Sequence, residues 1–214
     1  MSYQAHTEVY KGFTIKIHQD EDVSNPFTDC DGEPDFISWH RRYDFTFNKK
    51  FKNMDRDDFL ALAKKEGYIV LPLYMYEHSG RAFSTVAFSC PWDSGQLGYV
   101  FWTREKVEEG QGKGYDMEAN RTFLEKQLVS AVQMLEDWAE GNCYGYVVER
   151  EDGEEVGSCW GYLGDYDGEY GALQEAKSTA DWQFDQDIKD KKDKAAADFP
   201  LLKDQLKQLE ESNA

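Results

Sequence analysis

The sequence predicts an α+β fold in which a mainly antiparallel sheet of five to seven strands is covered by one long helix. The apolar and aromatic stretch from Ile69 to Trp102 is typical of three consecutive strands. Residues Asp116 to Glu140 carry apolar side chains three and four positions apart, as an amphipathic helix does. From about residue 179 the composition becomes strongly charged. We therefore expect a core domain over residues 1–178 and a charged helical C-terminal arm over residues 179–214.

The central strands are expected at Tyr68–His78, Phe83–Pro91 and Gln96–Trp102, where β-branched and aromatic residues are dense. Turn-forming residues separate them, at His78–Arg81 and at Asp93–Gly95. These segments predict an antiparallel three-stranded meander. Its apolar runs are too dense for a sheet with one solvent-exposed face, so we expect helices to cover one side of the sheet.

Several flanking elements follow from local patterns. Val9–His18 alternates between apolar and polar residues, which predicts a half-buried strand, and Phe36–Phe47 is expected to form another. Asp55–Lys65 begins with acidic residues, ends with lysines and is followed by Gly67, which is the order that a helix favours. Thr103 is expected to cap a short helix.

The segment Cys143–Gly164 predicts a hairpin around the Asp152-Gly153 turn. Pairing Glu151 with Glu154 places Trp160 over Gly145 and puts Trp160 on the face that we assign to the core. The same face is expected to carry Cys143, Val147, Val156 and Tyr162. The opposite face carries Tyr144, Tyr146 and Val148. The two faces are close in apolar content, so the reverse assignment stays open, and the tyrosines are an alternative exposed patch for a partner.

The chain is strongly acidic, with 42 Asp and Glu against 24 Lys and Arg and a formal net charge of -18. Nucleic acids and anionic membranes are bound through Lys and Arg, so the sequence argues against direct contact with either. The charge favours basic partners, including the nucleic-acid-binding grooves of other proteins. The sequence has no apolar export segment and no membrane-length apolar run, so we expect a cytoplasmic protein.

No catalytic, cofactor or metal motif stands out. The four cysteines, Cys30, Cys90, Cys143 and Cys159, lack the CxxC and Cys/His spacings of zinc sites. Neither a cofactor nor a metal is therefore expected. Calcium binding is an alternative interpretation of the acidic loop Gln19–Asp35. The loop departs from the EF-hand pattern, because Gly32 comes too early and no bidentate Glu closes the loop.

Two acidic loops are the predicted contact regions for a basic partner. The first lies within Gln19–Asp35 and the second within Asp165–Gly171. The second loop could bind a metal or a basic side chain, but a plain turn is the interpretation that we favour for it. The acidic residues expected to bind the partner are Asp20, Glu21, Asp22, Asp29, Asp31, Glu33, Asp35, Asp165, Asp167 and Glu169.

An alternative site lies in the turn between the second and third central strands. Its reactive residue types are His78, Cys90, Trp92, Asp93, Ser94 and Gln96. A nucleophile paired with a base needs His78 beside Cys90 or Ser94. Consecutive turns of a meander lie at opposite ends of the sheet. Bringing His78 beside Cys90 or Ser94 therefore requires a bend or another segment that crosses over. We favour a structured turn in which Asp93 caps the backbone, Trp92 packs underneath and Cys90 is buried.

Three segments carry a resemblance to a known family. They are PLYMYEHSG (72–80), FSCPWDSGQLGYV (88–100) and CYGYVVEREDGEEVGSCWGYLGD (143–165). Together they resemble a family of proteins encoded by phages, prophages and other mobile elements, over roughly residues 40–165. The family has no established activity, so the resemblance implies a genetic setting rather than a reaction. Phage accessory proteins of this size are often inhibitors of host defences.

The charge and the resemblance together predict an acidic protein that binds and inhibits a host defence protein. The expected target binds nucleic acid and is of the restriction or CRISPR type. The inhibition could work by nucleic-acid mimicry. One alternative is an accessory protein that contacts the host through aromatic surface without mimicry. The other is a small-ligand enzyme that uses the Cys90–Gln96 turn. A narrow apolar stripe, formed by Phe199, Leu201, Leu202, Leu206 and Leu209, suggests that the C-terminal arm pairs with a second copy of the chain.

Overall fold

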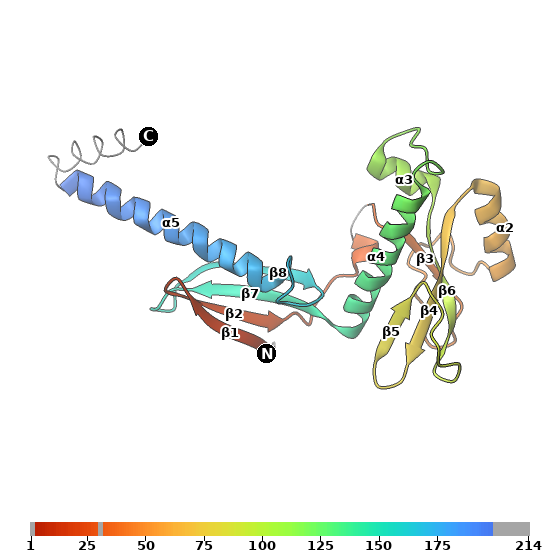
Figure 1. Cartoon of the computed structure of the whole chain (residues 1–214), viewed down its shortest axis with the longest axis horizontal. Coiled ribbons are helices and arrows are strands. Elements are labelled where there is room, and N and C mark those ends of the chain that lie inside the picture. The colour runs from red at the N-terminus through yellow and green to blue at the C-terminus, as the bar shows by residue number, and fades with distance from the viewer. Residues whose placement is uncertain (1–2, 30–31, 199–214) are drawn as a thin grey trace. The chain divides into compact units, whose positions relative to one another are not determined.

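The computed structural model describes residues 3–29 and 32–198, and they form two compact units (Figure 1). One unit joins the chain up to Asp20 with the chain from Tyr144 onward, and the other spans Glu21–Cys143. The described residues form eight strands in two antiparallel four-stranded sheets. The predicted α+β class and the long C-terminal helix are confirmed. The single sheet of five to seven strands is wrong, because the chain leaves the first sheet after two strands and returns to it later.

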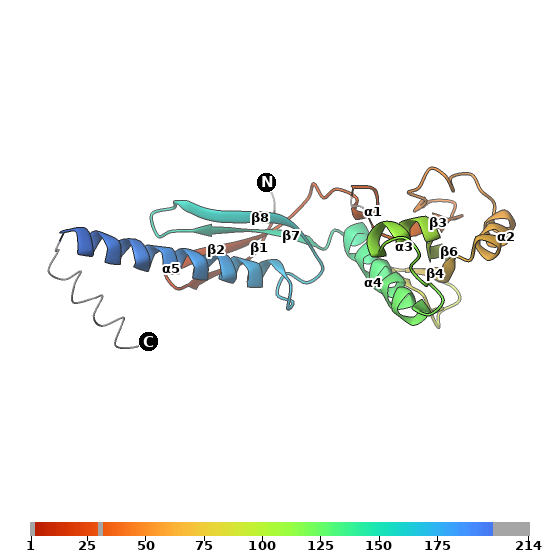
Figure 2. The same ribbon diagram turned by 90° about the horizontal axis from the view of Figure 1, so that it is seen from above.

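The first unit is one sheet with a helix against one face. Its strands are β1 (Gln4–Tyr10), β2 (Phe13–Gln19), β7 (Cys143–Glu149) and β8 (Glu155–Leu163), in the order β1-β2-β7-β8. Helix α5 (Ala172–Asp198) packs its buried first turns on this sheet and continues past the ends of the strands (Figure 2). The domain boundary expected at residues 178–179 falls inside α5, next to the fully buried Ala180.

The segment predicted as one strand over Val9–His18 contains the end of β1, a turn and most of β2. Lys11 and Gly12 have φ angles of 50° and 87°, and Tyr10 pairs with Phe13. Two successive positive φ angles are those of a type I′ turn, which suits the twist of a two-residue hairpin. The alternation of apolar side chains therefore predicts the strand correctly only beyond the turn.

The core of this unit uses Tyr146 and Val148 from the tyrosine face of the hairpin, so placing Trp160 in the core was wrong. Cys143 is nevertheless buried, and Val156 and Tyr162 pack against the core as predicted. Tyr146 and Val148 are buried with Phe13, Ile15 and Ile17, while Trp160 is 45% exposed. The predicted stacking of Trp160 over Gly145 is present, since a Cβ built on Gly145 lies 2.3 Å from the ring.

Tyr162 departs from the predicted alternation along β8. Its ring lies 5.9 Å from that of Tyr146, on the core side, although Trp160 faces outward. Gly161, between the two aromatic residues, has a φ of 90°. A positive φ interrupts the extended backbone, so residues 160 and 162 do not share a face as they would in a regular strand.

The second unit is a sheet between helices. Its strands are β3 (Asp35–Ser38), β4 (Ile69–Glu77), β5 (Arg81–Ser84) and β6 (Ser94–Trp102), in the order β3-β6-β4-β5. Its helices are α1 (Pro26–Asp29), α2 (Arg56–Glu66), α3 (Arg104–Gln111) and α4 (Arg121–Glu140). The strands predicted over Phe36–Phe47 and Phe83–Pro91 are each much shorter than expected.

The predicted meander is wrong in its strand order. β4 pairs with β5 on one side and with β6 on the other, so β4 is the central strand of the three. The residues between β5 and β6, Thr85–Asp93, therefore cross from one side of β4 to the other. We refer to them as the crossing segment.

Helices cover both faces of this sheet rather than one (Figures 1 and 2). Val100 is buried on the side of α4, with Leu128 and Leu135. The next residue, Phe101, is buried on the side of α2, 4.8 Å from the ring of Phe59. This double burial explains why the apolar runs in the sequence are nearly continuous.

The predicted Gly67 end of α2 and the predicted Thr103 cap of α3 are confirmed, and Asp55 adds a cap at the start of α2. The Asp55 carboxylate accepts a hydrogen bond from the Asp58 N–H at 2.9 Å, and Gly67 ends α2 with a φ of 68°. The Thr103 hydroxyl accepts from the Lys106 N–H at the start of α3. Each cap satisfies a backbone group that the helix itself leaves without a partner.

Candidate functional site

The crossing segment brings the turn before β6 to the end of β4. Tyr76 pairs with Ser94, and the Glu77 N–H donates to the Asp93 carbonyl at 2.8 Å. His78 follows directly, so it lies at the same end of the sheet as the turn. The predicted separation of His78 from the turn is wrong, because a crossing segment is present in place of a simple meander.

Asp93 stands between the two reactive side chains. Its Oδ2 is 3.7 Å from the Cys90 Sγ and 3.7 Å from the His78 Nδ1. The Ser94 hydroxyl donates to the Cys90 carbonyl at 2.5 Å. The thiol contact is to a carboxylate, and the serine hydroxyl is already engaged with the backbone. The arrangement supports a structured turn rather than a nucleophile and its base.

Trp92 is 91% exposed, so the prediction that it packs beneath the turn is wrong. Its neighbours Pro91 and Asp93 are exposed as well. Cys90 is half-buried rather than buried. An exposed tryptophan presents a large, flat surface to a ligand or a partner.

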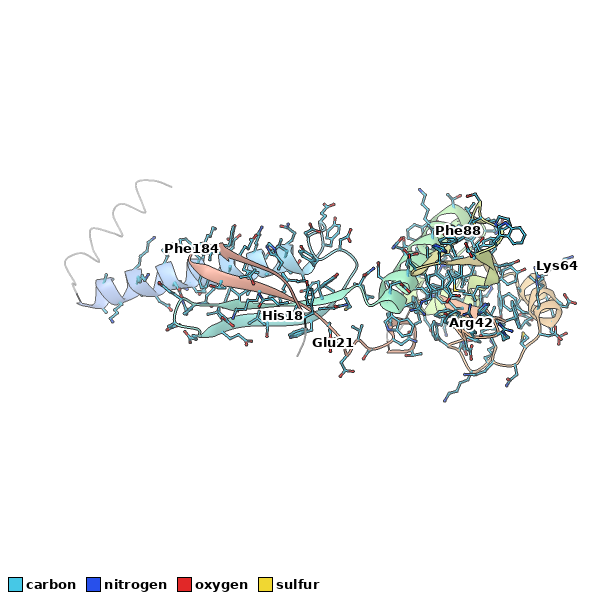
Figure 3. The ribbon with its side chains drawn as sticks, turned by 90° about the horizontal axis from the view of Figure 1, so that it is seen from below. His18, Glu21, Arg42, Lys64, Phe88 and Phe184 are labelled. Carbon is cyan, nitrogen blue, oxygen red and sulfur yellow. The ribbon has the colours of Figure 1, made fainter. Side chains whose placement is uncertain are left out.

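A polar cavity of about 330 Å³ lies beside this turn. Its lining comes from the loop after β3, the end of β4, the crossing segment and the start of β6. The lining residues are His40, Arg42, Met75, Glu77, Trp92, Asp93, Ser94, Gly95, Gln96 and Leu97. Four of the six residues proposed for the alternative site therefore share one cavity. His40, Arg42 and Glu77 were not predicted as site residues, because strand order alone brings them to the cavity. Figure 3 labels Arg42 among the side chains of this unit.

The two carboxylates of the cavity differ in their partners. Glu77 accepts from the Arg42 guanidinium and from the Tyr43 hydroxyl, both at 2.5 Å. The hydrogen bond to the carboxylate raises the pKa of Tyr43. Among the described residues, Asp93 has only His78 as a basic side chain within ion-pair distance, at 3.7 Å. Glu77 is therefore held by its neighbours, whereas Asp93 is available.

The first acidic loop is only partly exposed. Asp35 is 4% exposed, pairs with Lys106 at 3.2 Å and accepts from Asn48. Glu33 is half-buried, and burial raises the pKa of its carboxyl. Asp35 is therefore placed where a partner cannot reach it freely, contrary to the prediction.

The other acidic residues of that loop are either more accessible or not among the residues that the structure describes. Glu21 and Asp22 are exposed, and Asp20 is half-buried. Asp31 and the side chain of Asp29 lie outside the described residues. No cluster of three His, Cys, Asp or Glu residues suited to a metal ion occurs in the part of the chain that was described.

The second acidic loop, Asp165–Gly171, is exposed and held in a defined conformation. Asp165, Asp167 and Glu169 are all exposed. The Gly168 N–H donates to the Asp165 carbonyl at 3.1 Å, and the Gly171 N–H donates to the Gly168 carbonyl at 3.0 Å. These bonds fold the loop into consecutive turns that display its three carboxylates.

An aromatic side chain anchors this loop from beneath. Tyr166 lies 5.4 Å from the Tyr144 ring and stacks on His6 at 5.9 Å. Tyr170, by contrast, is 83% exposed beside the carboxylates. The predicted aromatic patch of Tyr144 and Tyr146 is absent, since both rings pack inside this unit.

Comparisons of the chain with protein-family models, with curated proteins and with solved structures found no match. Within residues 3–29 and 32–198, no helix combines the length and the apolar character that crossing a membrane requires.

Proposed function

We propose that the protein is an acidic inhibitor that occupies a basic, nucleic-acid-binding surface of a host defence protein. The observation that carries this proposal is the Asp165–Gly171 loop, whose three carboxylates are exposed while its backbone is held by turns. A preordered loop loses little conformational entropy on binding, so its charges contribute more of their interaction energy. Arginine and lysine side chains that normally hold phosphates would pair with these carboxylates.

The charge of both units supports a basic partner. Residues 21–143 carry 22 acidic and 14 basic side chains, and the rest of the chain carries 20 and 10. A negative field over the whole chain attracts a basic surface and repels nucleic acid. The protein would therefore compete with the nucleic acid for its partner rather than bind the nucleic acid.

A version without mimicry is supported by Tyr170. Its exposed ring next to the loop carboxylates resembles the usual arrangement of an aromatic anchor within a polar rim. In that version the affinity comes mainly from the ring, and added salt weakens binding only slightly. The two versions therefore differ in salt dependence. The C-terminal contact with a second copy, predicted at Phe199–Leu209, lies outside the described residues.

The test is capture from a bacterial lysate by the immobilised protein, with elution by a salt gradient. The loop variant carries Asp165→Asn, Asp167→Asn and Glu169→Gln. The control removes three other exposed carboxylates through Asp57→Asn, Glu109→Gln and Asp190→Asn. We expect a nucleic-acid-binding protein to be released at moderate salt by the wild type and by the control, and its affinity to fall at least tenfold for the loop variant.

Competition with nucleic acid completes the test. Purified partner should lose its DNA or RNA when the wild-type protein is added, and should keep it when the loop variant is added. A partner that elutes identically from all three proteins would contradict the role of the loop. A partner retained at high salt but lost on Tyr170→Ala would favour the version without mimicry.

A further inference from the structure

We infer that the cavity beside the crossing segment binds a single arginine side chain of a partner protein. The inference relies on the proposed function only for the basic character of the partner. It concerns a different unit from the acidic loop, and therefore a second contact point. Three features carry it, namely the exposed indole of Trp92, the available carboxylate of Asp93 and the charge balance of the cavity.

The first feature is the indole, which lines the cavity and is 91% exposed. A cation over the face of a tryptophan is attracted by the ring quadrupole, and tryptophan is the strongest such partner among the aromatic residues. Guanidinium is planar and weakly hydrated, so it stacks on an indole better than an ammonium does.

The second feature is the difference between the two carboxylates. Glu77 already has Arg42 and Tyr43 as donors, so the negative charge of Glu77 is balanced within the cavity. Asp93 has His78 and the Cys90 thiol only at 3.7 Å, which is too long for a strong hydrogen bond. Its carboxylate can accept two parallel N–H bonds from a guanidinium.

The third feature is the charge and size of the cavity. With neutral histidines, Arg42 balances Glu77 and the charge of Asp93 remains, so the cavity carries a net negative charge. A phosphate or another anion would be repelled by Asp93 and by the field of the chain. A volume of about 330 Å³ is at the small end of ligand pockets, and suits a side chain better than a cofactor.

The experiment titrates the full chain with capped amino-acid amides and observes the tryptophan indole N–H resonances by NMR. The probes are N-acetyl-arginine amide, N-acetyl-lysine amide and N-acetyl-citrulline amide, the last being a neutral analogue with the shape of arginine. Comparison with a Trp92→Phe variant identifies the Trp92 resonance. We expect a saturable shift with arginine, and at least fivefold weaker binding of lysine and citrulline.

Variants assign the contribution of each group. Asp93→Asn should weaken arginine binding at least fivefold, and Trp92→Ala should remove the response of the Gln96 backbone amide. The controls are Trp182→Ala and Asp167→Asn, an exposed tryptophan and an exposed carboxylate of the other unit, and neither should change the titration. The unaltered remainder of each NMR spectrum verifies that the variants fold.

Several results would overturn the inference. Equal binding of citrulline and arginine would show a neutral polar pocket, and an unchanged affinity in Asp93→Asn would remove the carboxylate from the site. No saturable shift up to 50 mM arginine amide, a concentration on the order of weak-ligand affinities, would exclude the site. If the lysate capture depends on the acidic loop while the titration fails, only this inference is wrong. If arginine binds but no partner is captured, the proposed function fails and the arginine site stands.

Discussion

At the scale of single residues, Gly98 is the position where the second unit tolerates no side chain. A Cβ built there lies 1.9 Å from the Ile37 carbonyl oxygen and 2.8 Å from the Ser38 Cα. Both atoms belong to the backbone of β3, which pairs with β6 at this point. The clash cannot be relieved by rotating a side chain, so the strands themselves would have to separate.

We therefore expect Gly98→Ala to lower the free energy of unfolding by about 3 kcal/mol, at the upper end of typical overpacking effects. Gly95, in the same strand, serves as the control, because a Cβ added there meets no atom within 4 Å. Gly95→Ala should change stability by less than about 0.5 kcal/mol. Urea denaturation measures both. Equal stabilities of the two variants would show that β3 shifts freely.

At the scale of elements, an ion pair joins the β7–β8 turn to α5. The Arg150 guanidinium donates to both carboxylate oxygens of Asp187, and the Gln183 amide donates to one of them at 2.9 Å. The hydrogen bonds from Arg150 lower the pKa of Asp187 to about 2. This contact lies beyond the fully buried part of α5, so it extends the attachment of the helix to the hairpin.

The contact predicts a specific acid sensitivity. The pKa of Asp187 is lower in the folded state than its value of about 3.9 in the unfolded chain. The contribution of the ion pair to folding stability is therefore complete above about pH 4 and is lost as the pH falls to about 2. Asp187→Asn should therefore flatten the decrease of the melting temperature between pH 4 and 2. Thermal unfolding followed by circular dichroism tests this, with Asp185→Asn as the exposed control. A wild-type slope in Asp187→Asn would contradict the prediction.

At the scale of the whole molecule, the described residues form separate hydrophobic clusters, one in the first unit and two on the opposite faces of the sheet in the second. Leu128 is fully buried in the core between α4 and the sheet of the second unit. Ile17 is fully buried in the core between α5 and the sheet of the first unit. Local unfolding follows such cooperative units, so each core should respond to its own substitutions.

Leu128→Ala is expected to destabilise the second unit by about 2–5 kcal/mol, which is usual for a buried leucine. Hydrogen exchange should then accelerate in β3, β4, β5 and β6, while β1, β2 and β8 keep their protection. Ile17→Ala should produce the converse pattern. The exposed Val129 gives the control, since Val129→Ala removes no core contact. Loss of protection in both units from either variant would show that they unfold as one.

The sequence by itself determined the features that depend on a few neighbouring residues. These are the α+β class, the Gly67 end of α2, the Thr103 cap of α3, the turn at Asp152-Gly153 and the overall acidity. Caps, turns and amphipathic periodicity are each set by residues within one or two turns of backbone, so a local pattern is enough to identify them.

Only the tertiary structure decided how those elements combine. Ile17 pairs with Tyr146, more than a hundred residues away in the chain, and no local signal specifies that partner. The hairpin faces were close in apolar content, so packing against α5 selected Tyr146 and Val148 for the core. The cavity beside Trp92 arises because β4 lies between β5 and β6. Strand order and face selection depend on the packing of distant segments, which is why the site required the fold.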